Sequence, residues 1–427
     1  MINSASLHAV NEARFSQRFI RPRYDSYCFA NLPPTIEFLF TGKQQQQMLP
    51  LDAFGDLPRN YTNVIFFFID SFGWRFFERV SERFHFLKAI QTEGAISKMT
   101  SQFPSTTAAH VTCIHTGLDV GQSGIYEWNY YEPLVDDIIT PLLFSYARDK
   151  VVRDTVKRAA IPAERFFPKQ TFYQTLQQQG IASHILQYQA YTPSTYSDIV
   201  FRGASVHPYK TIQEAFDLLV ALVTARPTQP TYYFLYFDRI DTASHNHGPY
   251  SRQATEVADS LFTLMDHLFY KNIRGKAGNT LFMLTADHGQ VEVDPQTTFY
   301  LNRQMPGFTR YLKTNQKGAP LVPAGSPRDM FLHIKEECLD EAVGELRRRL
   351  AGRAEVYPTQ ELLEQHFFGL HEPSPALRSR LGNVVILPYR YETVWWYEEG
   401  RFEMHFQGHH GGLTAEEMEI PLLLLPL

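Results

Sequence analysis

The sequence predicts an α/β protein with a doubly wound, mostly parallel sheet and an inserted, smaller α+β cap domain. Three observations support this fold class: short apolar runs followed by acidic residues, helical patterns between these runs, and a change of composition after Val293. Unbroken apolar runs are typical of parallel strands buried on both faces. Their alternation with helices is typical of a doubly wound sheet, in which ligands bind beyond the carboxyl ends of the strands.

The first 60 residues are expected to form an N-terminal arm, or an extended segment that wraps around the core. They combine polar and aromatic residues with several prolines and a glutamine run at 44–47. The opening residues show no basic stretch followed by an apolar core, so we expect no secretory signal. The apolar run IPLLLLPL near residue 427 is too short to span a bilayer, so we expect no membrane span.

Three apolar runs predict strands of the central sheet. They cover residues 64–69, 232–237 and 280–285. Acidic residues follow each run: Asp70, then Asp238 and Asp241, then Asp287. Apolar residues at three-and-four spacing predict helices over 211–225 and 256–273. Because the carboxyl ends of parallel strands share one edge of a sheet, we expect the acidic side chains to meet there.

After Val293, prolines and glycines become frequent, and this shift predicts an inserted cap. One helix is expected over 339–352 and one hairpin over 394–406. Residues 407–427 then predict a loop, a short helix and an apolar strand that rejoins the main sheet. The predicted divisions are an arm over 1–60, a core over 61–293 and 401–427, and a cap over 294–400.

Composition narrows the class of protein. A hydrophobic content of 44% and a charged content of 20% are typical of a soluble globular chain. A net charge of −5 argues against a dedicated nucleic-acid surface or an anionic-membrane surface. Cys28, Cys113 and Cys338 are too widely spaced for a zinc-type pair or a disulfide framework. This cysteine usage favours a cytoplasmic protein.

The polar residues beyond the predicted strands are of metal-ligating types. They are Asp70, Asp241, His245, Asp287, His288, and His409 or His410. Taken singly, each motif also fits a turn or a helix cap. Together, six carboxylates and imidazoles exceed what one four-coordinate ion needs, so we predict two metal ions. Paired ions about 3.5–4 Å apart are typical of phosphoryl-transfer enzymes.

The stretch FPSTTAAHVTCIHTG places Thr106 and Thr107 just before a predicted helix. Threonine at this position caps helices, because its oxygen accepts from a free backbone N–H group. Alternatively, one hydroxyl is a nucleophile that attacks phosphorus from the positive N-terminal end of the helix. The two threonines cannot be assigned from this stretch alone.

Five segments together resemble the alkaline phosphatase superfamily, and within it the type I phosphodiesterase/nucleotide pyrophosphatase family. They are NVIFFFIDSFG, FPSTTAAHVTCIHTGL, IDTASHNHGP, TADHG and GHHGGLTAEEMEIPLL. They occur in family order and cover the predicted core. The resemblance implies an alkaline-phosphatase-like core and a metal-dependent phosphoric ester hydrolase.

The resemblance also implies roles for particular residues. One metal ion would be held by Asp70, Asp287 and His288, and a second by Asp241, His245 and His410. Thr107 would be the nucleophile and a further metal ligand, because it aligns without a gap when counted back from Thr116-Gly117-Leu118. Asn129 would contact the substrate phosphate, although direct counting lands on Trp128. A second departure is AAHV after the nucleophile, where the family has FPNH.

The expected activity is that of a phosphodiesterase or nucleotide pyrophosphatase that forms a covalent phospho-threonine. Zinc is the favoured metal and manganese the alternative. The expected substrate is a small phosphate ester or a nucleotide-like molecule. A phosphomonoesterase, a phosphonate hydrolase and a phosphomutase remain alternatives on the same metal core, and a non-catalytic binding module is disfavoured by the complete ligand set. Trp395, Trp396, Tyr397 and Phe402 of the cap could stack on an aryl group or pair across the predicted hairpin.

Overall fold

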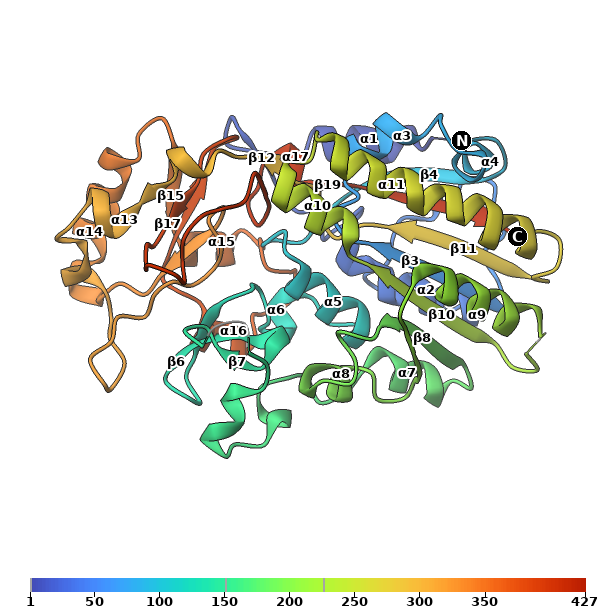
Figure 1. Cartoon of the computed structure of the whole chain (residues 1–427), viewed down its shortest axis with the longest axis horizontal. Helices are drawn as coiled ribbons and strands as arrows, with labels where there is room; N and C mark the ends of the chain where they lie inside the picture. The colour runs from blue at the N-terminus through green and yellow to red at the C-terminus, as the bar shows by residue number, and fades with distance from the viewer. Residues whose placement is uncertain (1, 150–151, 226) are drawn as a thin grey trace.

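The computed structural model describes residues 2–149, 152–225 and 227–427, and shows a mixed α/β molecule. Its central sheet has seven strands in the order β4-β19-β11-β3-β10-β8-β9 (Figure 1). These strands are β3 (Asn63–Ile69), β4 (Ala95–Thr100), β8 (Ala182–Tyr188), β9 (Ser205–Tyr209), β10 (Thr231–Phe237), β11 (Thr280–Thr285) and β19 (Glu419–Pro426). Only β19 pairs antiparallel to its neighbours. The mixed α/β class and the three predicted strands are confirmed.

The three predicted strands are direct neighbours in the sheet. β3 lies between β10 and β11 and pairs in parallel with both. Phe68 is opposite Tyr236 on one side and Thr285 on the other, so the three strands end at the same level. The residues that follow these strands are therefore placed side by side at one edge of the sheet. The final strand, β19, rejoins the sheet beside β11, as predicted.

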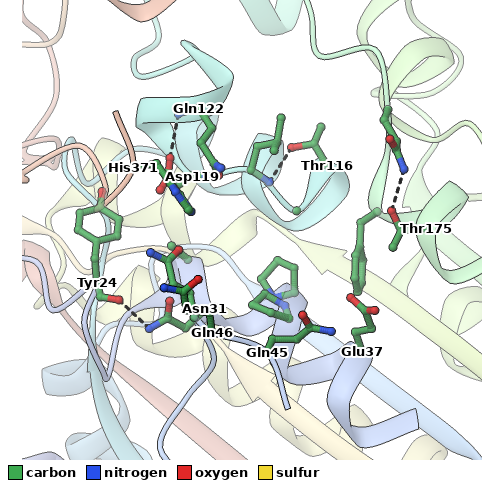
Figure 2. A pocket seen from close by; sticks show the side chains of 18 residues that line it. Tyr24, Asn31, Glu37, Gln45, Gln46, Thr116, Asp119, Gln122, Thr175 and His371 are labelled. Carbon is green, nitrogen blue, oxygen red and sulfur yellow. Dashed lines mark hydrogen bonds between the residues drawn. The ribbon is translucent and has the colours of Figure 1, made fainter. Parts of the chain in front are cut away.

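The first 60 residues contain regular secondary structure. They contain α1 (Ser4–Asn11), α2 (Leu32–Thr41) and the two-stranded sheet β1 (Arg14–Phe15) and β2 (Phe19–Ile20). The segment is therefore not extended throughout, and the arm over 1–60 stays a prediction. The prolines of α2 occupy its first turn, where proline is tolerated. Figure 2 shows how this segment forms one wall of a cavity of about 430 Å³, with Tyr24, Asn31 and Gln45 facing Thr116 and Asp119.

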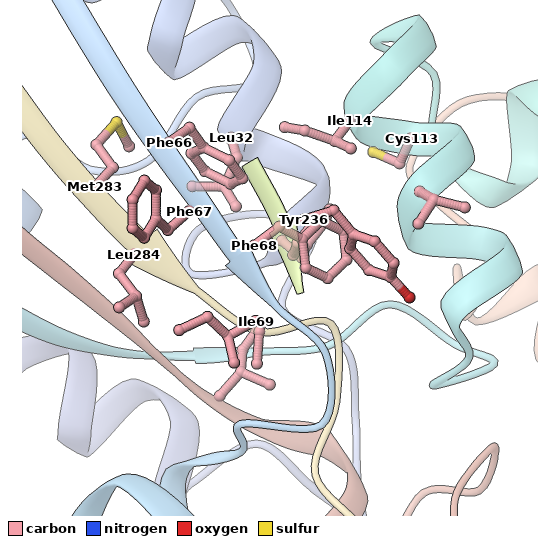
Figure 3. Close-up of a cluster of buried hydrophobic side chains, with 14 of the residues drawn as sticks. Leu32, Phe66, Phe67, Phe68, Ile69, Cys113, Ile114, Tyr236, Met283 and Leu284 are labelled. Atoms are coloured by element: carbon pink, nitrogen blue, oxygen red, sulfur yellow. The ribbon is translucent and has the colours of Figure 1, made fainter. Parts of the chain in front are cut away.

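Helices pack on both faces of the sheet. Successive side chains of β3 point to opposite faces, so both faces present apolar side chains to the helices. Phe67 stacks on Phe216 of α9 (Ile212–Thr224), with ring centroids 5.8 Å apart. On the other face, Phe68 contacts Phe29, and Figure 3 shows Ile114 of α5 (Thr107–Thr116) on that side. The helix predicted over 256–273 is α11 (Arg252–Leu264), which continues through a π-helical turn into α12 (Lys271–Ile273).

Shorter elements complete this part of the chain. The helices are α3 (Trp74–Val80), α4 (His85–Glu93), α6 (Val120–Ser123), α7 (Phe172–Gln178), α8 (Thr195–Val200) and α10 (Arg239–His247). The strands β5 (Tyr130–Glu132), β6 (Asp137–Thr140) and β7 (Ser145–Tyr146) form a small antiparallel sheet. No helix in the described ranges is both long and apolar enough to cross a membrane.

Residues between Phe299 and Phe402 build a second hydrophobic cluster, which includes Phe308, Leu346 and Ile386. The elements are α13 (Leu301–Gln304), α14 (Leu339–Arg349), α15 (Thr359–Glu364), α16 (Pro375–Arg380), β13 (Phe299–Tyr300), β14 (Met330–Leu332), β15 (Ala354–Pro358), β16 (Val384–Pro388) and β17 (Val394–Trp395). The predicted helix over 339–352 is confirmed as α14. The main core also reaches into this segment through Phe331 and Phe367, and the predicted domain boundaries stay a prediction.

The hairpin predicted over 394–406 is wrong. β17 pairs in parallel with β13 instead of folding back on the residues that follow it. Trp395, Trp396 and Phe402 are each less than a tenth exposed and belong to the second cluster. These side chains therefore fill a core, which explains their apolar pattern without cross-strand pairing and removes them from the candidates for stacking on a substrate.

Candidate metal centre

The first group of candidate ligands lies where β3 and β11 end. Ligand atoms of Asp70, Asp287 and His288 all lie within 4.8 Å of one another. His288 Nε2 is 3.2 Å from Asp287 Oδ2 and 3.5 Å from Asp70 Oδ1. The backbone N–H groups of Ser71 and His288 each donate to Asp287 Oδ1 at 3.0 Å, which fixes that carboxylate and leaves Oδ2 facing Asp70 and His288.

The second group is carried by α10 and by the loop after β18 (Gly408–His409), which pairs with β12 (Val291–Glu292). The sequence suggested that Asp241 lies at the end of a strand. It lies instead in the first turn of α10, and His245 lies one turn further on. His245 Nε2 lies 3.4 Å from Asp241 Oδ1 and 3.2 Å from His410 Nε2. Residues four apart share one face of a helix, which explains this approach.

The two groups are joined at His288. Ligand atoms of Asp241, His288 and His410 also lie within 4.8 Å of one another, so His288 belongs to both clusters. Its ring stacks on the ring of His410 with centroids 3.6 Å apart. The structure thus brings all six predicted ligands together at one edge of the sheet, in two adjoining groups.

Backbone carbonyls orient the three imidazoles. The Nδ1 atoms of His245, His288 and His410 lie 2.8, 3.0 and 3.0 Å from the carbonyl oxygens of Gly408, Gly289 and Ser105. A carbonyl can only accept, so each Nδ1 carries the proton and each Nε2 presents its lone pair. All three Nε2 atoms face the carboxylates. Sequence reasoning missed these carbonyls because backbone acceptors leave no residue-type signal.

Burial and mutual repulsion perturb the carboxyl groups. Burial raises the pKa of Asp70 well above its ordinary value, and the nearby Asp287 raises it further. Burial likewise raises the pKa of Asp287 to about 7 and the pKa of Asp241 in the same direction. Asp70 Oδ1 and Asp287 Oδ2 are buried and have no hydrogen-bond partner among the described residues. Such unpaired buried oxygens are what a bound cation would satisfy.

Thr106 and Thr107 divide the two tasks between them. Thr106 is the N-cap of α5, and its Oγ1 accepts from the Ala108 N–H at 3.2 Å. Thr107 opens the helix, and its Oγ1 lies 3.3 Å from both Asp70 Oδ2 and His288 Nε2. Capping therefore belongs to Thr106, while the Thr107 hydroxyl faces the first group of candidate ligands.

Three supporting residues escaped the sequence analysis. The Tyr236 hydroxyl donates to Asp70 Oδ2, and Gln290 Nε2 donates to Asp241 Oδ1 at 2.6 Å. His110, one turn after Thr107, lies with Nδ1 2.7 Å from the Thr106 carbonyl and accepts at Nε2 from the Gln102 N–H. Tyr236 belongs to an apolar strand, Gln290 to a loop and His110 to a buried helix, so only the fold shows where they point.

A cavity of about 220 Å³ opens beside Asp70, Thr107 and Asp241. Aromatic, aliphatic and charged side chains complete its lining, among them Trp128, Leu142, Arg153, Tyr191 and Asp238. Trp128 is 44% exposed, whereas Asn129 is buried and outside the cavity lining. Asn129 Oδ1 accepts from the Thr140 hydroxyl at 2.7 Å. The contact of Asn129 with a substrate phosphate stays a prediction, and Trp128 is the neighbour that borders the cavity.

The same strand ends, helix start and histidine loop match a known family. Residues 64–413 match Type I phosphodiesterase / nucleotide pyrophosphatase. The chain belongs to this family. The predicted resemblance is therefore confirmed.

Two curated relatives are longer proteins, both named ectonucleotide pyrophosphatase/phosphodiesterase family member 3. The Rattus norvegicus protein is 24% identical over 287 residues, which are 64% of this chain and 30% of the relative. The Mus musculus protein is 24% identical over 295 residues, 66% and 30% respectively.

Solved structures share the fold. Murine ectonucleotide pyrophosphatase/phosphodiesterase 5 has a TM-score of 0.60 at 20% identity, covering 84% of this chain and 87% of that one. An inactive variant of the murine protein in complex with AMP gives 0.60 at 19% identity, with the same coverage. The human protein gives 0.61 at 16% identity, covering 85% and 87%.

Proposed function

We propose that this protein is a metal-dependent phosphodiesterase or nucleotide pyrophosphatase-like hydrolase that uses Thr107 as its nucleophile. The observation that carries the proposal is the position of the Thr107 hydroxyl, 3.3 Å from both Asp70 and His288 at the start of a ten-residue helix. A hydroxyl in this position sits against candidate metal ligands and at the helix end that favours anions.

The residues present fit two divalent cations. Asp70, Asp287, His288 and Thr107 would hold the first, and Asp241, His245 and His410 the second. The unpaired buried oxygens of Asp70 and Asp287 support this proposal, as does the orientation of each imidazole Nε2. When bound, such cations lower the pKa of a hydroxyl and neutralise the charge of a phosphate ester. We propose zinc, with manganese as the alternative, because carboxylate and imidazole ligands suit both.

The chain's own groups then account for the reaction. Thr107 Oγ1 loses its proton to water and attacks phosphorus in line with the leaving oxygen. The bond between phosphorus and that oxygen breaks, and the oxygen takes up a proton from water and departs with its organic group. The product is a phospho-threonine, which water hydrolyses to regenerate the hydroxyl. Backbone N–H groups at the start of α5, together with Asn129, would hold the equatorial phosphate oxygens. Tyr236 and Gln290 keep Asp70 and Asp241 in place through the hydrogen bonds described above.

The proposed substrate is a small phosphate ester or a nucleotide-like molecule. The AMP complex of the similar murine protein supports this class, as does the aromatic wall of the neighbouring cavity. A cytoplasmic location remains a proposal, supported by Cys28, Cys113 and Cys338, which form no disulfide.

A panel of aryl phosphates tests the proposal. Purified protein is assayed on a bis-aryl phosphodiester, an aryl phosphomonoester and an aryl phosphonate, with metal content measured on the same sample. We expect about two metal ions per chain and faster hydrolysis of the diester. Preferential hydrolysis of the monoester or the phosphonate would move the assignment to one of the alternatives on the same metal core. Full activity after exhaustive chelation would overturn the metal-dependent mechanism.

A further inference from the structure

Two carboxyl groups meet outside the metal centre, in the interior of the protein. Glu127 lies between α6 and β5, and Asp329 immediately precedes β14. Their exposed fractions are 1% and 0%. The two side chains are close enough to hydrogen-bond to each other. Two buried carboxylates in contact are strongly destabilising unless a cation or a proton lies between them.

The buried arginines nearby are already occupied. Arg328 forms a two-point ion pair with Glu417 at 2.9 Å for each contact, and its remaining group donates to backbone carbonyls. Arg380 pairs with Glu132 at 2.8 Å and also donates to carbonyls. Asp329 Oδ2 has no conventional donor in the described part of the chain. No cation among these residues is therefore left to neutralise the pair.

We infer that Glu127 and Asp329 share one proton, and that this pair positions the loop bearing His410 relative to the cavity loop at Trp128. Neither residue belongs to a cluster of three or more acidic, histidine or cysteine ligands in the described part of the chain. A proton satisfies the pair without further ligands, because a protonated carboxyl donates to the ionised one. The link to His410 rests on the proposed function, whereas the shared proton does not.

The hydrogen bonds around the pair connect both loops. On one side, the Trp128 N–H donates to the Glu127 carboxylate. On the other, the Ser326 N–H donates to Asp329 Oδ1 at 3.1 Å, and the Ser326 hydroxyl lies 3.1 Å from the carbonyl oxygen of His410. A change in the charge of the pair therefore acts on the backbone of a candidate metal ligand through a single serine.

The other titratable groups that face the pair cannot supply its missing positive charge. They are Tyr126 and Glu417, and Tyr126 in turn lies beside Tyr130 and Arg380. Burial raises the pKa of both tyrosines, which keeps them neutral. Glu417 is negative and bound to Arg328. Burial also raises the pKa of Glu127 to about 8, and burial with the nearby Glu127 raises that of Asp329.

The sign of the pH dependence follows from linkage. A carboxyl with a raised pKa in the folded protein binds its proton more tightly there than in the unfolded chain. This carboxyl contributes its full stabilisation when the pH is below its pKa in the unfolded chain. The contribution falls as the pH rises toward the pKa in the folded protein, which is about 8 for Glu127. The nearby Glu127 raises the pKa of Asp329, so the pair keeps a proton that the unfolded chain has already lost. The wild-type protein should therefore lose stability across the range from about pH 5 to pH 8.

Glu127→Gln tests the shared proton. Glutamine keeps an acceptor for the Trp128 N–H and supplies a permanent donor to Asp329, so no proton is needed. Thermal melts of the metal-loaded wild type and variant are compared at pH values from 5 to 8. We expect the melting temperature of E127Q, relative to wild type, to rise steadily with pH. If the melting temperatures of the two proteins change with pH in parallel, the shared proton is overturned. A metal ion that stays bound in a variant lacking the six metal-centre ligands would mean that a cation, and not a proton, lies between Glu127 and Asp329.

A second comparison tests the link to His410. E127Q should keep kcat/KM at pH 7 within about threefold, because the hydrogen bonds survive. Its kcat/KM should also depend less on pH than that of wild type, because no shared proton can be lost from the pair. Ser326→Ala should lower metal retention during dialysis by about 10-fold or more, the scale for a residue supporting a ligand. Full retention by S326A would overturn the positioning role. If the protein hydrolyses no phosphate ester, the proposed function fails, but the thermal melts still test whether Glu127 and Asp329 share a proton.

Discussion

At the scale of single residues, the two adjacent threonines give the sharpest test of the proposed chemistry. Thr107→Ala should lower turnover by several orders of magnitude, as expected when a covalent catalytic group is removed. Thr107→Ser should keep measurable activity, because only a methyl group is lost. The three proteins are compared on one aryl phosphodiester, with thermal melts on the same samples.

Thr106→Ala is the matched control. It removes the cap of α5, so the free energy of unfolding should fall by about 0.5–2 kcal/mol while the chemistry persists. An inactive T106A beside an active T107A would show that the ungapped count is off by one residue. Activity in both would remove the covalent mechanism.

The residues visible from the sequence are those whose chemistry is rare in a hydrophobic context. Asp70 and Asp287 follow buried strands, and an acidic residue there already suggests a site. Tyr236 was invisible because an aromatic residue in an apolar strand is usually part of the core. Its hydroxyl reaches Asp70 only because β10 lies next to β3.

At the scale of elements, strand β18 ends between two adjacent histidines, so that His409 lies in the strand and His410 in the loop after it. The His410 ring stacks on His288 and its Nε2 lies 3.2 Å from His245. His409 instead accepts the His410 N–H at its Nδ1, 3.0 Å away. His410→Ala should therefore reduce kcat/KM by about 100-fold or more, whereas His409→Ala should have a milder effect. Metal content of each variant accompanies the kinetics, and equal losses would show that the two histidines were assigned without basis.

Elements with an unbroken apolar run were predictable, and those with mixed patterns were not. β9 is an edge strand with exposed residues, so it carries no continuous run. β4 is buried but contains Lys98, whose ammonium lies 2.9 Å from Glu419 of β19. That partner is far away in the sequence, and a lysine in the middle of a segment argues against a buried strand until the partner is known.

At the scale of the whole molecule, the candidate metal centre depends on the C-terminal segment rejoining the central sheet. β19 enters the sheet beside β11 (Figure 1). The segment between β18 and β19 carries His410 to Asp241 and His288. The five motifs were readable separately, but the distances between them follow from strand order. The shared position of His288 between the two groups could not be derived from spacing in the sequence.

Removal of metal should destabilise the whole molecule, and more so at higher pH. Without cations, Asp70, Asp241 and Asp287 are buried together, and their pKa values are raised, that of Asp287 to about 7. The chelated protein must keep protons on these groups, so its stability falls as pH rises through that range. Bound cations replace the protons and stabilise the folded state by mass action.

The difference in melting temperature between metal-loaded and chelated protein should therefore widen from pH 5 to pH 8. Thermal melts of both forms across this range measure it, and addition of zinc to the chelated sample should restore the midpoint. The control is a protein in which Asp241→Asn and His410→Ala remove the second group, where the effect of zinc should shrink but persist through the first. If this difference in melting temperature is the same at all pH values, protonation of the three carboxyl groups does not link metal binding to the stability of the fold.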